Sequence, residues 1–232
     1  MADAGYLTVQ DTRVWCGAMR LPSKVCATIA AAALLTVPGC SKVVTGVAVP
    51  DPHQPTAKSS PCEQVSAPLT PIDPHADGEP RLRIPQPPGW ERASMLDSEV
   101  IRFTMRNKDL LANNFMPTAV VTLESVPGAA SDDHTIFDQE RAALVDRLGA
   151  TGLHTKETTL CGDTAELVDY DAPSMGRIPP RKIRTLMVAA TFDTNTYVST
   201  VTVQSTDPDN PVYARDTGTV LTGFQMLPPG GG

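Results

Sequence analysis

The most informative stretch of the sequence is Leu186-Met187-Val188-Ala189-Ala190, followed by the turn residues Asp193-Thr194-Asn195 and then by Tyr197-Val198-Ser199-Thr200-Val201-Thr202-Val203-Gln204. The first run is apolar at every position, which indicates a strand that is buried on both faces. The second run is rich in β-branched residues, which favour strands. A short polar turn between two such runs predicts a β-hairpin.

Two further segments, 119–126 and 164–170, have the composition of strands that extend this hairpin into a sheet. Between them, residues 132–148 have acidic residues at the start and are followed by Gly149, as is typical of a helix. A second, shorter helix is predicted to end near Leu221. The first helix has an apolar stripe that is expected to cover the sheet: Phe137, Leu144, Val145 and Leu148. We therefore predict an α+β fold, an antiparallel sheet flanked by helices.

The N-terminal region has the pattern of an export signal. Arg20 and Lys24 precede an apolar run at 25–37, which is typical of a secretory signal peptide. Gly39 and Cys40 follow, and this junction resembles the lipobox of bacterial lipoproteins. The resemblance implies a diacylglyceryl group and palmitate on Cys40, with removal of residues 1–39. The alternative is a transmembrane anchor, but the run falls short of the ~20 residues that span a bilayer.

The predicted domain boundaries follow changes in composition. Residues 1–18 are interpreted as an untranslated extension before Met19, or as an unusually long start of the signal. Residues 40–80 are rich in proline and predict an extended tether. The folded domain is expected at 81–227, starting with an edge strand, and 228–232 form a tail. Four tether residues alternate as metal ligands can, but an extended tether holds no fixed geometry, so no metal site is predicted: Asp73, His75, Asp77 and Glu79.

Five cysteines are present, and three of them belong to the signal or to the lipidation site. Cys62 and Cys161 are the remaining two. In an exported protein, two such cysteines usually form a disulfide. Two free thiols or an intermolecular bond are the alternatives.

Charge and motifs exclude several classes of function. The net charge of −7 becomes −8 without residues 1–39, which argues against a nucleic-acid partner, since nucleic acid requires clustered cations. We find no nucleophile, zinc or phosphate-loop motif, so neither an enzyme nor a cofactor is predicted. His134 and His154 are interpreted as solvated. The acidic run from Asp163 to Asp171 is interpreted as an exposed strand face.

One stretch carries a family resemblance. Ile84-Pro85-Gln86-Pro87-Pro88-Gly89-Trp90, together with Pro117-Thr118-Ala119, resembles the LpqN/LpqT family of mycobacterial lipoproteins over about residues 80–227. The resemblance implies a PsbP-like α/β/α sandwich. It also implies a link to envelope lipids or to partner proteins. The cysteine pair at 62 and 161 is not part of the family pattern.

These observations favour a non-catalytic lipoprotein anchored to the outer face of the cell membrane. Its expected role is to bind or carry an apolar or amphipathic envelope molecule. The alternative is a surface-exposed interaction module for host or envelope proteins, and an enzyme is the third reading. Trp90, Met105 and Met187 are the tentative binding residues, Trp90 because an indole can stack on a ligand and the methionines because their flexible side chains adapt to acyl chains. A core position is the alternative for Trp90.

Overall fold

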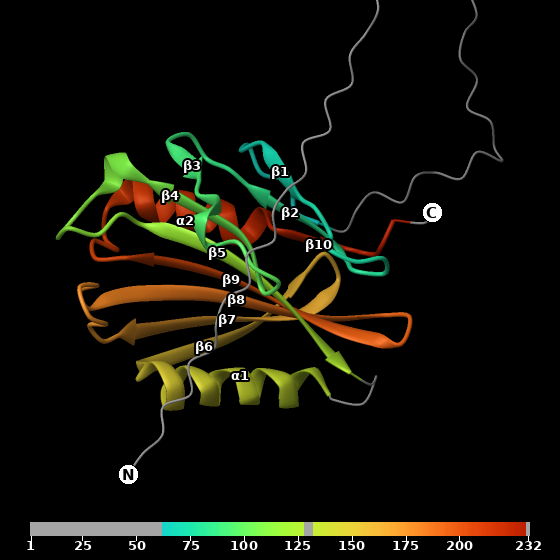
Figure 1. Cartoon of the computed structure of the whole chain (residues 1–232). Helices are drawn as coiled ribbons and strands as arrows, with labels where there is room; N and C mark the ends of the chain where they lie inside the picture. Colours follow the sequence, from blue (N-terminus) through green and yellow to red (C-terminus); the bar gives the residue numbers. More distant parts are fainter. Residues whose placement is uncertain (1–61, 128–131, 231–232) are drawn as a thin grey trace, which may run out of the picture. The chain divides into compact units, whose positions relative to one another are not determined.

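The structure is a computed structural model, and it describes residues 62–127 and 132–230 (Figure 1). The predicted signal peptide, Cys40 and the first part of the tether lie outside the described residues. Among the residues described, no helix is long and apolar enough to cross a membrane.

The larger sheet has seven antiparallel strands in the order β3-β4-β5-β9-β8-β7-β6. The hairpin predicted from the sequence is confirmed as β8 and β9, joined at Asp193, whose φ of +54° suits a tight turn. It lies near the middle of the sheet, which explains why β8 is buried on both faces. The strand bounds are β3 (Trp90–Arg92), β4 (Ile101–Asn107), β5 (Thr118–Pro127), β9 (Asn195–Ser205), β8 (Arg181–Phe192), β7 (Asp163–Ala172) and β6 (Thr151–Leu160).

A second sheet has three antiparallel strands in the order β1-β2-β10. β2 (Arg81–Pro85) is the central strand of this sheet and not the edge strand that was predicted from its alternation and Pro85. Its partners are β1 (Leu69–Ile72) and β10 (Gln225–Leu227). β1 falls within the segment predicted as a tether, so the last part of that segment belongs to the fold.

Two helices cover opposite faces of the larger sheet, as Figure 1 shows. Helix α1 (Asp133–Leu148) packs on one face and ends at Gly149, whose φ is +64°. Helix α2 (Pro211–Gly223) lies on the other face with the small sheet, and the Asn210 side chain caps its first turn. Two short 3-10 turns, η1 (Ser94–Leu96) and η2 (Lys108–Leu110), flank β4. The predicted α+β class, with a sheet between layers of helices, is confirmed.

Helix α1 meets the sheet differently from the prediction. Phe137 is buried and Leu144 is half-buried, but Val145 and Leu148 are 46% and 42% exposed. Between these apolar residues, Arg141 forms an ion pair with Glu166 of β7. The central turn of the helix therefore meets the sheet through charged groups, and the apolar contact is concentrated in the first turns.

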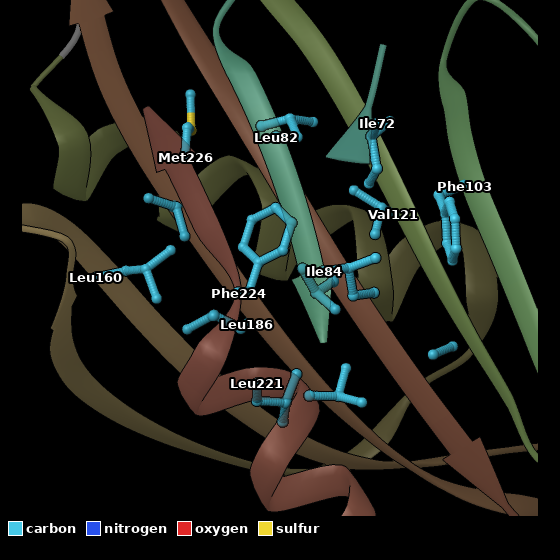
Figure 2. Packing of buried hydrophobic residues seen from close by; sticks show 14 of the residues in the cluster. Ile72, Leu82, Ile84, Phe103, Val121, Leu160, Leu186, Leu221, Phe224 and Met226 are labelled. Atoms are coloured by element: carbon cyan, nitrogen blue, oxygen red, sulfur yellow. The ribbon is translucent and has the colours of Figure 1, made fainter. Parts of the chain in front are cut away.

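The hydrophobic core has two parts, one on each face of the larger sheet. Alternate residues of β8 point to opposite sides, so that Leu186 and Val188 join the α2 face while Met187 and Ala189 join the α1 face. Figure 2 shows the α2-face core, where side chains from the small sheet, from α2 and from the larger sheet interlock around Phe224 and Ile84.

Candidate binding groove

A groove of about 430 Å³ lies on the α2 face, where strands β6, β7 and β8 extend beyond the cover of the helix. Volumes of this size are typical of small-molecule sites. We call it the binding groove. Its lining includes, from the strands, Gly152, His154, Asp169, Asp171, Lys182 and Arg184, and from the opposite wall Pro208, Asp209, Tyr213, Ala214 and Thr217.

The floor of the groove is a ladder of charged side chains. Arg184 of β8 donates two hydrogen bonds to Asp169 of β7, at 2.6 and 3.0 Å. Lys182 and Asp171 form the next rung, with Nζ and Oδ1 2.6 Å apart. His154 of β6 lies directly across the strand pair from Asp169. The floor is thus nearly neutral but rich in donors and acceptors, which suits a polar group of a ligand.

Hydrogen bonding to Asp169 raises the pKa of Arg184 above its usual value. This guanidinium is therefore a fixed cation at any physiological pH. The two carboxylates of the β7 floor each have a cationic partner, Asp169 with Arg184 and Asp171 with Lys182.

The opposite wall of the groove is formed by α2. The Tyr213 ring is 5% exposed, and burial raises the pKa of its hydroxyl to about 12, although Thr217 and Arg184 act in the other direction. Ala214 lies beside it and is exposed. The wall therefore presents the Ala214 methyl group and a small part of the Tyr213 ring to the groove.

One glycine shapes the floor. Gly152 has a φ of +63°, and a Cβ there would lie 3.3 Å from Oδ2 of Asp171. The pairing of β6 with β7 is irregular at this point, between Thr151 and His154. A side chain at this position would disturb the Asp171 carboxylate, so glycine is the residue that fits.

A second cavity of about 250 Å³ lies farther along the same strip of strands β6–β8, at the C-terminal end of α2. Four leucines from three strands and the helix line it together with polar residues: Leu160, Leu167, Leu186 and Leu221, and Glu63, Thr158, Thr159 and Thr222. On α2, Gly218 falls between Ala214 of the groove and Thr222 of the second cavity. A Cβ at Gly218 would meet nothing within 4 Å. The groove with its charged floor and a cavity lined by leucine and threonine thus lie along one helix.

The predicted disulfide between Cys62 and Cys161 is present in the structure. It ties the start of the described chain to the β6–β7 hairpin beside the second cavity. The segment after Cys62 then lies against the end of α2, where a Cβ at Gly223 would come within 2.4 Å of Val65. The disulfide therefore fixes one wall of the second cavity.

The structure does not bring Trp90, Met105 and Met187 together. Each is at most 2% exposed, and the two methionines belong to cores on opposite faces of the sheet. None of the three lines the groove or the second cavity. Trp90 occupies the core position that was its alternative, and its indole donates to Asp216.

The acidic alternation at 73–79 serves a structural role. Glu79 accepts hydrogen bonds from Arg102 and from the His75 backbone, and Arg102 is buried. Within the described part of the chain, no group of three or more histidine, cysteine, aspartate or glutamate side chains is placed to hold a metal ion.

The groove residues were not predicted as a site, although His154 and the acidic run were noticed separately. The useful signal was the spacing of charges on two neighbouring strands. Asp169 and Asp171 have the same two-residue spacing as Lys182 and Arg184, and an antiparallel pairing places the two sets opposite each other.

No protein-family model and no curated protein matches the chain. Among solved structures, LpqN of Mycobacterium tuberculosis, described as involved in cell envelope biogenesis, is similar with a TM-score of 0.55 and 16% identity. The likeness covers 69% of this chain and 91% of LpqN. A Pseudomonas aeruginosa protein of unknown function gives a TM-score of 0.41 at 16% identity, covering 66% of this chain and 95% of its own. The chain and LpqN are thus related distantly, by their fold.

Proposed function

We propose that this chain is an exported lipoprotein of the cell envelope that binds an apolar or amphipathic envelope molecule without transforming it. The observation that carries the proposal is the groove beside α2, whose charged floor faces a wall with Ala214 and Tyr213, with a cavity of leucine and threonine lining farther along the helix. A ligand with a polar head and an apolar chain matches this order of surfaces.

Three further observations support the envelope setting. The sequence before Cys40 has the pattern of a lipoprotein signal. The Cys62–Cys161 disulfide suits an oxidising compartment outside the cytoplasm. The similar fold of LpqN, a protein involved in envelope biogenesis, fits the same setting.

The polar head is assigned to the groove because its paired charges can be shared with a ligand at little cost. Asp169 and Arg184 are both about half exposed, so their hydrogen-bonding groups remain accessible. The apolar chain is assigned to the second cavity because burying a methylene group gives ~0.8 kcal/mol.

The test is a ligand-binding measurement on the mature chain purified in detergent and incubated with a lipid extract of its host. Ala214→Trp should fill the groove and abolish the lipid detected by native mass spectrometry. The matched control is Val212→Trp, which places the same side chain at an exposed position of the same helix outside the groove lining. Equal lipid binding by both variants would contradict the proposal.

A protein-interaction module is the second candidate, and the η1 turn favours it. Met95 and Leu96 are 95% and 59% exposed. The turn is nevertheless held in place, since Arg92 pairs with Asp97 at 2.6 Å and Ser98 bonds Ile101 in both directions. A held loop with exposed apolar side chains is typical of a protein contact. Loss of a co-purifying protein on Met95→Ser, with lipid binding intact, would favour this candidate.

A further inference from the structure

The two ends of the larger sheet differ in character. At one end β5, β6 and β8 begin and β4, β7 and β9 finish, and the binding groove lies there. We call this the groove end. At the other end lies the β6–β7 hairpin with Cys161, and we call it the disulfide end. In Figure 1 the loops that belong to one end lie together at that end of the strands.

Exposed apolar side chains are concentrated at the groove end. The loops and helix ends there carry six of the large hydrophobic residues that are exposed in the described chain: Leu111, Val145, Leu148, Met175, Ile178 and Val212. The disulfide end carries three, namely Met95, Leu96 and Val100. Exposed apolar side chains that gather in one region are typical of surfaces that contact a protein or a membrane.

The loops at the groove end support one another. The Arg181 guanidinium lies 5.7 Å from the centre of the Phe115 ring, which links the β4–β5 loop to the start of β8. The Thr206 hydroxyl donates to the carbonyl of Ala112 at 2.8 Å, so the β9–α2 loop joins them. The exposed apolar residues are thus presented by braced loops.

Charge is distributed in the opposite sense. The described connecting segments at the disulfide end contain no lysine or arginine. They carry Glu63, Asp73, Asp77, Glu79, Asp97, Glu99 and Asp193, and the strand-end cations Arg81, Arg92 and Arg102 offset only part of this charge. The β1–β2 segment belongs to this end because His75 lies 3.7 Å from Glu99. At the groove end, acidic loop residues are balanced by cations in the loops and at the strand ends: Arg106, Lys108, Arg147, Arg177, Arg181 and Lys182.

We propose that the groove end is a membrane-docking surface that rests on an anionic phospholipid bilayer. Apolar side chains on braced loops can enter the headgroup region, as they do in interfacial membrane proteins. An anionic surface repels the acidic disulfide end and tolerates the balanced groove end, so charge selects which end approaches. The docking surface depends on the proposed function in one respect, since the lipid anchor is what keeps the domain near the bilayer.

Docking in this orientation has a consequence for the ligand. Asp209, Lys182 and Gly152 line the groove close to the loops that meet the bilayer. A lipid headgroup could therefore pass from the membrane surface into the groove without crossing open water.

The experiment measures which end touches the bilayer. The mature full chain is mixed with vesicles of phosphatidylglycerol and phosphatidylethanolamine, or held on them by its own anchor. A fluorophore is attached at Met175→Cys or, as the matched control, at Met95→Cys. Both positions are exposed loop methionines, one at each end. Quenchers on the lipid chains should reduce the emission severalfold at 175 and leave it nearly unchanged at 95.

Two triple variants complete the test without labels. Leu111→Ser with Met175→Ser and Ile178→Ser should release anchor-free chain from the vesicles. Met95→Ser with Leu96→Ser and Val100→Ser should leave binding unchanged. Equal quenching at both positions, stronger quenching at 95, or equal binding of the two triple variants would overturn the proposal. A defined protein bound at 175 in place of lipid would also overturn it.

The outcome is separable from that of the proposed function. Vesicle docking is measured without a groove ligand, and ligand binding is measured in detergent without vesicles. A chain that docks but binds no lipid in the groove would keep the docking surface and remove the carrier role.

Discussion

The indole Nε1 of Trp90 donates a hydrogen bond to Oδ2 of Asp216, at 3.0 Å, across 126 residues of sequence. Both side chains are buried, at 2% and 1% exposure. The second carboxylate oxygen accepts from Arg215, at 3.0 and 2.8 Å. The contact fastens α2, the wall of the binding groove, to β3 at the far edge of the sheet.

Trp90→Phe should destabilise the fold by about 2–3 kcal/mol, because it leaves a buried carboxylate oxygen without its donor. Urea denaturation at neutral pH measures the loss. Lys108→Ala is the control, since Lys108 and its partner Glu91 are both exposed and the removal of this pair should change stability little. Equal costs for the two variants would mean that the buried bond has no special weight.

Replacing both cysteines of the Cys62–Cys161 bond by serine should lower stability by roughly 2–5 kcal/mol. The bond closes a loop across 99 residues, and a cross-link of that span removes much chain entropy from the unfolded state. Denaturation of the wild type with and without a reductant gives the same difference by an independent route. A reduced wild type as stable as the oxidised one would refute this prediction.

Phe137→Ala should cost about 3–5 kcal/mol, as is usual for a buried aromatic residue. Val145→Ala, in the same helix, should change stability by less than about 0.5 kcal/mol, because the side chain is largely exposed. Leu144→Ala should fall between them. A high cost at Val145 would show that α1 packs through its whole predicted stripe.

The ion pair of Glu79 with Arg102 should make stability depend on acid pH. Burial raises the pKa of Glu79, but hydrogen bonds from Arg102 and the His75 backbone outweigh it, so the pKa lies below its usual 4.5. Because the pKa of Glu79 is lower in the folded state, the ion pair stabilises the fold at any pH above the pKa of the unfolded state. This stabilisation is lost as the pH falls through the lower pKa of the folded state.

Glu79→Gln should therefore cost on the order of 3 kcal/mol at neutral pH, since it leaves the buried Arg102 without its counter-charge. The difference in unfolding free energy between Glu79→Gln and the wild type should become smaller at pH values below the usual pKa of glutamate. Glu91→Gln removes an exposed pair with Lys108 and should have no measurable effect. Parallel pH profiles for wild type and Glu79→Gln would exclude this role for the pair.

Gly218→Ala should stabilise α2 by about 0.5–1 kcal/mol, because the new methyl group meets open space and alanine favours helix. Gly223→Ala, five residues later, should be destabilising by about 1–3 kcal/mol, since its Cβ would collide with Val65. Thermal unfolding distinguishes the two signs. A destabilising Gly218→Ala would show that the space beside Gly218 is smaller than the structure indicates.

The central sheet could be predicted because its signals are local. The apolar run of β8 and the β-branched residues of β9 and β5 each specify a strand, and a turn at Asp193 joins two of them. The small sheet was largely missed for the opposite reason. β1 and β10 are separated by some 150 residues. The proline of β1 made it resemble part of the tether, and the proline of β2 made it resemble an edge strand.

The groove escaped prediction because its residues are polar and individually unremarkable. His154, Asp169 and Tyr213 come from three elements, and only the folded chain places them around one space. Single residues such as Trp90 attracted attention because of their chemistry, yet long-range packing assigns them to the core. Pairing of charges across neighbouring strands was the one local clue to the site.

The disulfide also has a mechanical consequence for a chain pulled by its N-terminal side. Tension applied at Cys62 passes through the covalent bond directly to Cys161 in the β6–β7 hairpin. Strands β1 to β6 and helix α1, which lie between the two cysteines, carry none of this load and cannot be extended by it. Under a pulling force at the N-terminal side, only the residues that follow Cys161 can be extended. The disulfide therefore limits how far the domain can be unfolded by force.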